Sequence, residues 1–301
     1  MRVWGVAARY NRPGDELREN GGLPTKGPRP MTSTAFDDYE RSQWAGRATA
    51  YRDSLAALCA YPAALLLDAA HVEAGVRLLD VGTGTGTVAA LACSRAAVVV
   101  AVDAEPSMLD VARRLAPAAD IRPGTLPRLP FVDNHFDAAV ANFVINHVGD
   151  PAAAIGELRR VVRPGGRVAV TIWPYPPPPA QLLWSTIFDA AGVRRPADLP
   201  RVASDKDFAR TSAGLIGLLR RSGLVDVHCD TIAWAHHTDT EAWWNGPANG
   251  IGATGMLLRR QDPSTINQVR VHYDQHTAAY RDTSGRLRLP TAALLAAASV
   301  S

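Results

Sequence analysis

Short apolar runs alternate with helical patterns over residues 76–173. The run at 97–102, Ala-Val-Val-Val-Ala-Val, has no polar side chain, which is typical of a parallel strand buried on both faces. Stretches with helical spacing stand on either side of it, at 87–96 and 106–115. Further elements continue the alternation: strands from residue 121, at 138–143 and at 168–173, and a helix at 151–162. This order predicts a doubly wound α/β sheet.

The residues before and after this core predict helices added around the sheet. Apolar residues recur at helical spacing over 35–70. Five prolines in the six residues 174–179 predict a stiff, extended segment that leads to a short helix near 182–188. We therefore expect the chain to leave the sheet after the fifth strand and to return to it later.

The last third of the chain mixes helical and extended patterns. Three helices are expected, at 211–222, 242–260 and 263–281, and a sixth strand at 225–234. Residues 286–290 predict the final strand. Residues 291–300 are rich in alanine and predict an exposed tail helix.

A glycine-rich turn joins the first strand to the first helix. Gly82 and Gly84 fit the dinucleotide fingerprint G-x-G-x-x-G, but position 87 is Thr and the third glycine is Gly86. A phosphate-binding loop also needs a lysine, and this turn has none. The spacing therefore disfavours both kinds of phosphate-bearing ligand.

Asp80 stands two residues before Gly82, at the end of the strand. A carboxylate there repels a pyrophosphate where water is scarce, and it suits a ligand with an ammonium group. S-adenosylmethionine has an ammonium group, a carboxylate, a ribose and an adenine, and no phosphate. The competing interpretation is a glycine-rich strand–helix turn without a ligand.

A second acid, Asp103, follows the second strand, 21 residues beyond Gly82. An acid at this place and interval accepts hydrogen bonds from the two ribose hydroxyls of a nucleotide-like ligand. Two acids at consecutive strand tips are more specific than either alone, and together they favour a nucleoside ligand at this edge of the sheet.

Charge and composition exclude several classes of function. Apolar residues make up 47% of the chain, and no apolar run reaches the roughly 18 residues of a membrane span. Residues 1–30 have six basic and three acidic side chains, which accounts for the whole net charge of +3. The remainder has no basic excess for nucleic acid. Residues 1–30 also lack apolar periodicity, so we expect disorder there, with a start at Met31 or a short basic arm as alternatives.

The three cysteines, Cys59, Cys93 and Cys229, are scattered along the chain. Their number is odd and their spacing is not that of metal ligands. We therefore expect a reduced, cytoplasmic protein with no disulfide framework and no metal site.

Four groups of residues together resemble the class I S-adenosylmethionine-dependent methyltransferases, of the small-molecule type found in ubiquinone and menaquinone biosynthesis. The groups are Leu79-Asp80-Val81-Gly82-Thr83-Gly84-Thr85-Gly86, Val102-Asp103, Leu129-Pro130-Phe131 with Phe136-Asp137, and residues 158–166. They cover about residues 76–173, a third of the chain. The resemblance implies a Rossmann-like sheet of seven strands with the last strand reversed.

The resemblance also implies roles for single residues. Asp80 and the glycines Gly82, Gly84 and Gly86 would hold the methionine part of S-adenosylmethionine, and Asp103 would hold its ribose. Ala104 and Met108 would line the adenine. Where the family has an acid that accepts from the adenine amino group, this chain has Thr125, followed by Leu126. An uncharged hydroxyl should bind the adenine more weakly, which lowers the expected affinity without changing the expected cofactor.

The end of the fourth strand narrows the choice of acceptor. Methyltransferases acting on amino groups of nucleobases carry Asn/Asp-Pro-Pro-Tyr there, whereas this chain reads Asn142-Phe143-Val144-Ile145. With the balanced charge, this disfavours DNA bases. Asn142 is expected either to contact the methionine ammonium or to cap the strand. His147 is a candidate general base, with a structural role as the alternative.

Aromatic residues outside the core are candidates for an acceptor pocket. They are Tyr39, Trp44, Tyr51, Trp173, Trp184, Trp243 and Trp244. Ligands bind at the carboxyl ends of the strands in such sheets, so we expect the N-terminal helices and the two insertions to form a cap there. The competing interpretation is that these aromatics only fill the cap's own core. His236 and His237, just past the sixth strand, are further candidate bases.

These expectations divide the chain into segments. They are an N-terminal extension (1–30), a helical lid (31–75), an S-adenosylmethionine-binding core (76–173), a cap insertion (174–210), a continuation of the core (211–237), a second cap insertion (238–285) and a last strand with its tail (286–301). The predicted activity is methyl transfer to O, N or C of a small apolar or aromatic metabolite, as in secondary metabolism.

Three other functions remain as alternatives. The same fold and cofactor would serve non-methylation chemistry, such as decarboxylation or cyclisation, or a catalytically silent binding partner. An NAD-dependent oxidoreductase is disfavoured by Thr87 and Asp80. The sequence leaves open the acceptor, the methylated atom and the oligomeric state, a homodimer included.

Overall fold

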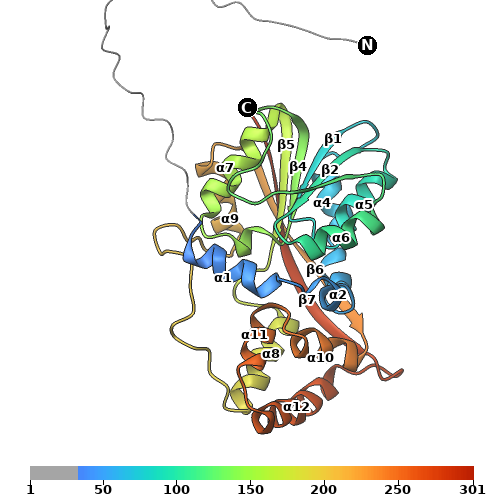
Figure 1. The fold of residues 1–301 in the computed structure, drawn as a ribbon, viewed down its shortest axis with the longest axis vertical. Coiled ribbons are helices and arrows are strands. Elements are labelled where there is room, and N and C mark those ends of the chain that lie inside the picture. The colour runs from blue at the N-terminus through green and yellow to red at the C-terminus, as the bar shows by residue number, and fades with distance from the viewer. Residues whose placement is uncertain (1–32) are drawn as a thin grey trace, which may run out of the picture. The chain divides into compact units, whose positions relative to one another are not determined.

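A seven-stranded sheet lies at the centre of residues 33–301, the part of the chain that this computed structural model describes (Figure 1). The strand order is β3-β2-β1-β4-β5-β7-β6. The strands are β1 (Arg77–Val81), β2 (Val98–Asp103), β3 (Asp120–Pro123), β4 (Phe136–Asn142), β5 (Val162–Ile172), β6 (Val225–Thr238) and β7 (Leu287–Ser299). Neighbours among β1–β5 pair in parallel, whereas β7 is antiparallel to β5 and to β6. The predicted Rossmann-like sheet with a reversed last strand is therefore confirmed. The predicted disorder of residues 1–30 concerns residues outside the described range.

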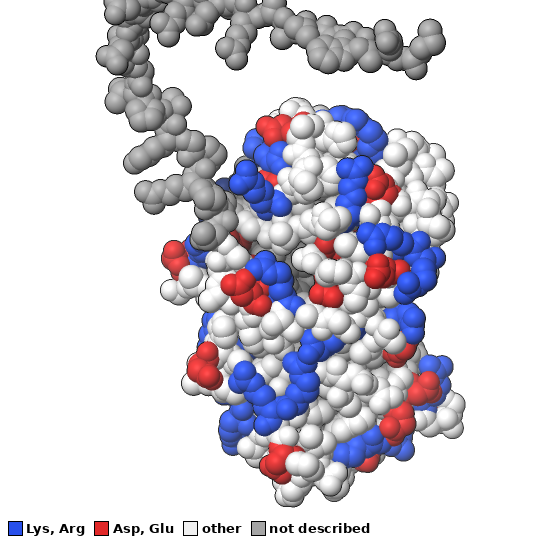
Figure 2. Space-filling model, in the orientation of Figure 1, with Lys and Arg blue, Asp and Glu red and all other residues white. Residues whose placement is uncertain are grey.

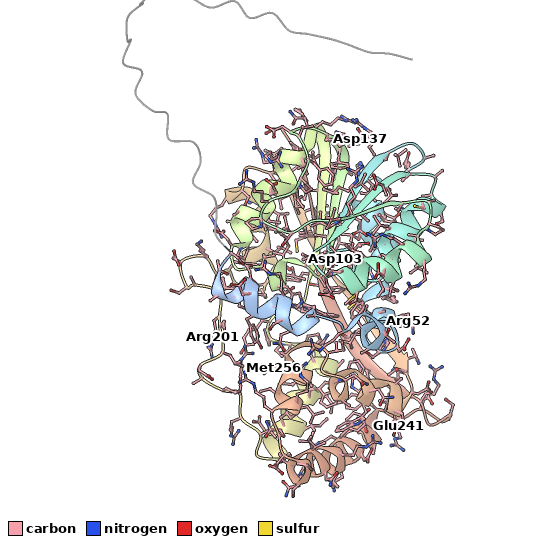
Figure 3. The ribbon with its side chains drawn as sticks, viewed as in Figure 1. Arg52, Asp103, Asp137, Arg201, Glu241 and Met256 are labelled. Atoms are coloured by element: carbon pink, nitrogen blue, oxygen red, sulfur yellow. The ribbon has the colours of Figure 1, made fainter. Side chains whose placement is uncertain are left out.

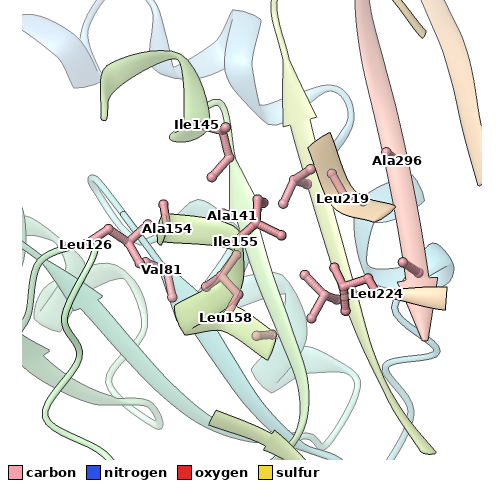
Figure 4. Close-up of a cluster of buried hydrophobic side chains, with 14 of the residues drawn as sticks. Val81, Leu126, Ala141, Ile145, Ala154, Ile155, Leu158, Leu219, Leu224 and Ala296 are labelled. Atoms are coloured by element: carbon pink, nitrogen blue, oxygen red, sulfur yellow. The ribbon is translucent and has the colours of Figure 1, made fainter. Parts of the chain in front are cut away.

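Helices cover both faces of the sheet. One face packs against α4 (Ala63–Ala69) and α5 (Thr87–Ser94), and the other against α7 (Pro151–Val161) and α9 (Ser212–Arg221). Leu78 and Leu79 are both fully buried, and they belong to the clusters on opposite faces. Figure 4 shows part of the α7–α9 side, where Ile155 and Leu158 lie among side chains of β1, β4 and β7. α6 (Pro106–Leu115) packs beside β2 and β3.

The tail helix predicted at 291–300 is wrong, because β7 occupies Leu287–Ser299 and most of it is buried. Ala296 pairs with Val170 of β5 on one side and with Cys229 of β6 on the other. A position between two strands supplies hydrogen-bond partners and burial on both sides, and these outweigh the preference of alanine for helices. The strand β6 is also four residues longer than predicted, reaching Thr238.

The helices other than α4–α7 and α9 lie beyond the carboxyl ends of the parallel strands (Figure 1). The predicted helical stretch at 35–70 is four short helices, α1 (Ala35–Trp44), α2 (Ala48–Arg52), α3 (Ala56–Ala60) and α4. The cap consists of α8 (Pro179–Ala190), α10 (Thr240–Ala248), α11 (Gly252–Arg259) and α12 (Pro263–Thr277). Its apolar cluster includes Trp234 of β6 and Leu289 of β7, so the far ends of these strands hold the cap.

The two ends of the sheet differ in what they face. Asp103 lies at the end towards the cap, whereas Asp137 lies at the opposite end (Figure 3). Asp137 forms ion pairs there with Arg77 and Arg163. Among residues 33–301, no helix is long and apolar enough to cross a membrane.

Candidate functional site

A cavity of about 690 Å³ lies between the strand tips, the N-terminal helices and the cap. Eight residues predicted to bind a cofactor line it: Gly82, Gly84, Asp103, Ala104, Met108, Thr125, Leu126 and Asn142. So do His147 and five of the predicted acceptor-pocket aromatics: Trp44, Tyr51, Trp173, Trp184 and Trp243. The fold thus brings the predicted cofactor-binding residues and most of the predicted acceptor-pocket aromatics to one cavity.

The glycine turn lets the chain pass close to the loop after β4. The backbone N–H groups of Gly82 and Thr83 both donate to the carbonyl oxygen of Val102, which fixes the turn against β2. A Cβ atom on Gly82 would stand 2.4 Å from Cγ2 of Val144, and φ at this residue is +67°. Only glycine fits this position without displacing Val144.

Asp103 accepts two backbone hydrogen bonds at the tip of β2. Its Oδ2 accepts from the N–H of Gly84 at 2.8 Å, and its Oδ1 accepts from the N–H of Glu105 at 2.9 Å. Each carboxylate oxygen can accept a second hydrogen bond. Because Asp103 lines the cavity, it can accept from the hydroxyl groups of a bound ligand.

Asp80 lies in a small recess next to the cavity, together with Gly82 and Gly84. Its side chain is buried, and its Oδ2 accepts from the Thr83 hydroxyl at 2.7 Å. Its Oδ1 is buried without a hydrogen-bond partner among the described residues. Burial raises the pKa of Asp80 to about 7, the Thr83 hydrogen bond opposes this shift, and the nearby charge of Asp103 adds to it. The recess therefore offers an unpartnered carboxylate oxygen that a cationic group would stabilise.

Asn142 ties β4 to its neighbours. Its Nδ2 donates to the carbonyl oxygen of Cys59 at 2.9 Å, and its Oδ1 accepts from the Thr171 hydroxyl at 2.6 Å. The first bond attaches α3 to the tip of β4, the second joins β4 to β5, and the residue also lines the cavity.

Phe143 has a left-handed backbone with φ of 59°, which is uncommon for a bulky residue. Its N–H donates to the carbonyl and hydroxyl oxygens of Thr171. The ring stacks on Trp173, with centroids 4.0 Å apart and planes at 18°. The strained backbone thus places a flat aromatic pair in the cavity wall, between the strand tips and the cap.

The side chain of His147 contacts a residue of helix α1. Its Nδ1 lies 2.8 Å from Oε2 of Glu40. The ring of Trp44 packs edge-on against the imidazole, with centroids 5.5 Å apart. One turn earlier in α1, Asp37 accepts the backbone N–H of Gly149 at 2.7 Å. The helix α1 is therefore attached to the loop after β4 by two carboxylates.

Residues 79–170 match the family described as Methyltransferase domain. Residues 79–170 are therefore a methyltransferase domain. Demethylmenaquinone methyltransferase of Paenarthrobacter aurescens is 35% identical over 144 residues, which cover 48% of this chain and 56% of that protein. The same-named protein of Thermus thermophilus is 42% identical over 117 residues, 37% of this chain and 53% of that protein.

The chain thus spans about half the length of the curated relatives it matches. The solved structure of the YcgJ protein from Bacillus subtilis is similar with a TM-score of 0.52 and 20% identity. The similarity covers 80% of this chain and 99% of that one, and it shows a shared fold. The shared fold therefore extends over most of residues 33–301, well beyond the residues of the family match.

Six predicted site residues do not line the main cavity of the methyltransferase domain. They are Asp80, Gly86, Tyr39, Trp244, His236 and His237. Asp80 occupies the adjoining recess, and Gly86 packs against the backbone of Ala112 in α6. Trp244 packs on Tyr273, under the guanidinium of Arg270.

The two histidines after β6 are also placed away from the cavity. His236 is buried beside Trp243, and burial lowers its pKa to about 4. His237 is exposed. Of the three candidate bases, His147 alone lines the cavity.

The structure adds lining residues that the sequence did not single out. Glu40, Phe143 and Gln181 all line the cavity. Glu40 adjoins Tyr39, which the sequence predicts for the pocket, and a difference of one position decides which side chain faces inward. Gln181 is the one polar residue among Ala180, Leu182 and Leu183, and that isolation was a usable signal.

The outer surface of the described residues bears charges of both signs. Lys and Arg side chains lie among Asp and Glu side chains over most of the face in Figure 2. Within residues 33–301, no group of three or more His, Cys, Asp or Glu side chains is arranged to hold a metal ion.

Proposed function

We propose that this chain is an S-adenosylmethionine-dependent methyltransferase with a small, apolar or aromatic acceptor. The family match supports the reaction class, and the shared fold supports the position of the site at the strand tips. The demethylmenaquinone methyltransferase relatives support a small-molecule acceptor. In this proposal residues 76–173 and 211–237 form the cofactor-binding core, and residues 31–75, 174–210 and 238–285 cover it.

The observation that carries the proposal is the unpartnered Oδ1 of Asp80. A buried carboxylate oxygen without a partner is costly, and a ligand ammonium group next to it removes that cost. Asp103, with acceptor capacity left on both oxygens, suits the ribose hydroxyls. Gly82 and Gly84 give the methionine part access to the backbone, and Met108 and Leu126 give the adenine an apolar surface. The residues present therefore fit S-adenosylmethionine.

Bound S-adenosylmethionine supplies a sulfonium methyl group that leaves without help from an acid. The work of this chain is then to orient the acceptor in line with that methyl, and orientation alone can lower the barrier by several kcal/mol. The stacked pair of Phe143 and Trp173 supplies a flat wall for this purpose. Aromatic faces beside a cation add roughly 0.5–2 kcal/mol each.

A hydroxyl acceptor or an acidic carbon also needs a general base. We assign this role to His147, because it lines the cavity and its ring is fixed from behind by Glu40. With Nδ1–H donated to Glu40, the neutral ring keeps Nε2 free to take a proton.

Calorimetric titration tests the cofactor assignment. Titrating the full chain with S-adenosylmethionine, and separately with NAD, should give binding of the first and none of the second. Tight binding of NAD with no binding of S-adenosylmethionine would overturn the proposal.

A further inference from the structure

A band of basic side chains crosses the molecule below α1, over α11 and the loop after α8 (Figure 2). Its exposed arginines are Arg195 and Arg201 in that loop, and Arg259 and Arg260 at the end of α11. Figure 3 places Arg201 in the same region. We call these four residues the basic face. Basic and acidic side chains balance over residues 31–301, but this face shows that they are not evenly spread.

The arginines of the basic face lack acidic partners. None of the four forms an ion pair within residues 33–301. The helix α11 has no acidic residue. The exposed acid of α1, Asp38, is already paired with Arg41. Likewise Asp189 of α8 is paired with Arg194. An anionic partner would therefore meet guanidinium groups that are not paired with a carboxylate of the described residues.

Tyr39 lies at the edge of the basic face. The sequence predicts it for the acceptor pocket, but it does not line the cavity, and it is partly exposed beside Phe36, with ring centroids 6.5 Å apart. Burial is the largest influence on the pKa of its phenol, which it raises. The charges of Arg195 and Arg260 oppose this rise in pKa, so both guanidinium groups lie near the ring. Partly exposed aromatic rings next to arginines are typical of surfaces that contact a lipid bilayer.

The cavity opens next to the basic face. Ser42 and Ala45 of α1 and Ala253 of α11 all line the cavity and are exposed. The side chain of Arg259 donates to Oε1 of Gln43 at 3.0 Å, which joins the two helices. Because an α-helix rises about 1.5 Å per residue, Arg259 stands only about 9 Å from Ala253 along α11. A partner bound at the basic face would therefore lie at the mouth of the cavity.

We propose that the basic face docks on an anionic lipid bilayer, from which an apolar acceptor enters the cavity. Guanidinium groups bind phosphate in a bidentate manner, and the negative surface of such a bilayer attracts each exposed arginine. The ring of Tyr39 suits the boundary between headgroups and acyl chains. An apolar acceptor also concentrates in a bilayer because water excludes it. On this last point the inference rests on the proposed function, whereas the charge and position of the face do not depend on it.

Co-sedimentation with lipid vesicles tests the inference. The full chain would be mixed with vesicles of phosphatidylcholine alone, and with vesicles in which about 30% of the lipid is phosphatidylglycerol. We expect the anionic vesicles to bind roughly tenfold more tightly, with a loss of affinity as the salt concentration rises. Arg195→Glu combined with Arg260→Glu should weaken this binding about tenfold or more. Tyr39→Ser should weaken it about threefold, because the interfacial ring is lost.

The matched control is Arg220→Glu combined with Arg221→Glu, at the end of α9. These are also two exposed arginines without an ion pair among the residues described. They lie just before the start of β6, whereas the cap packs on the far end of that strand. The change in net charge is the same, and affinity should stay within about twofold of wild type. Melting temperatures would verify that both double variants are folded.

Absence of binding, equal binding to the two kinds of vesicle, or equal losses in the two double variants would contradict the inference. Binding that neither double variant weakens would place the contact elsewhere on the chain, for example in the basic residues 1–30, and would contradict it too. Vesicle binding needs no cofactor. The titration with S-adenosylmethionine therefore tests the proposed function separately, so failure of one can be distinguished from failure of the other.

Discussion

His147 and Glu40 lie 2.8 Å apart, Nδ1 to Oε2, although they are 107 positions apart in the sequence. One comes from the short helical turn after β4 and the other from α1. The contact therefore exists only while α1 lies over the cavity. The orientation of the imidazole, the proposed base, therefore depends on the position of α1.

Replacement of His147 tests this role. His147→Gln should lower kcat about 100-fold with a hydroxyl acceptor and leave the dissociation constant of S-adenosylmethionine within about twofold. Glu40→Gln should lower kcat by a smaller factor, about tenfold, because the ring stays but loses its fixed orientation. Release of S-adenosylhomocysteine in a small-molecule cell extract is the measurement. His237→Gln, a change at an exposed histidine, is the control. Full activity of His147→Gln would show that His147 is not a general base in the reaction.

Asp80→Asn should have opposite effects on stability and on binding. Burial raises the folded-state pKa of Asp80 to about 7, above the roughly 3.9 of an unfolded chain. Between these values the folded state holds the proton more tightly, so the ligand-free protein loses stability as pH rises from about 4 to 7. The variant lacks this loss. It should melt at a higher temperature than wild type at pH 8, with the difference shrinking as the pH falls and vanishing near pH 4.

The same substitution should weaken binding of S-adenosylhomocysteine at least tenfold, because its ammonium group loses the carboxylate. Differential scanning fluorimetry and calorimetry on the same samples give both readouts. A variant that is destabilised at pH 8, or that binds with unchanged affinity, is incompatible with the assigned role of Asp80.

Asp103→Ala should abolish binding of S-adenosylhomocysteine, since the ribose hydroxyls lose their acceptor. The matched control is Asp137→Ala, which removes an aspartate at the opposite end of the sheet (Figure 3). Asp137 holds Arg77 and Arg163, so this control can cost some stability but should leave cofactor affinity within about twofold. Calorimetry at one temperature compares the two variants. Equal affinity of Asp103→Ala and wild type would refute the ribose assignment.

Gly82→Ala should disrupt the glycine-rich turn after β1 for a steric reason. The new methyl would stand 2.4 Å from Cγ2 of Val144, at a residue with positive φ. Binding of S-adenosylhomocysteine should fall at least tenfold. The double variant with Val144→Ala removes the clash but keeps the strained backbone, so it should recover part of the affinity. No recovery in the double variant would show that the contact with Val144 is not the cause.

The alternating core of the fold could be predicted from the sequence because its signals are local. The Val98–Val102 run, the glycine turn and the proline at the start of α6 each specify one element without help from distant residues. The strand β7 could not be predicted in this way. Its alanines form a strand because β5 and β6 pair with them on both sides, and those partners are more than 50 positions away in the sequence.

The residues of the site also divide into those that local sequence predicts and those that only tertiary packing places. Asp80 and Asp103 stand at strand tips that the sequence already placed, so their proximity followed from the fold. Their aromatic character predicts a place in the pocket for Tyr39 and Trp244, but the orientation of their helices turns both away from the cavity. Glu40 has no distinctive local signal, whereas Gln181 stands alone among apolar neighbours, and tertiary packing brings both to the cavity wall.

The most direct test of the methyltransferase assignment is transfer of a labelled methyl group. The full chain would be incubated with methyl-labelled S-adenosylmethionine and the small-molecule fraction of a cell extract, with the Asp103→Ala variant in parallel. Label in an organic-soluble product, matched by S-adenosylhomocysteine release and absent with the variant, is the predicted result. S-adenosylmethionine that binds tightly but yields neither labelled product nor S-adenosylhomocysteine across such fractions would contradict the assignment.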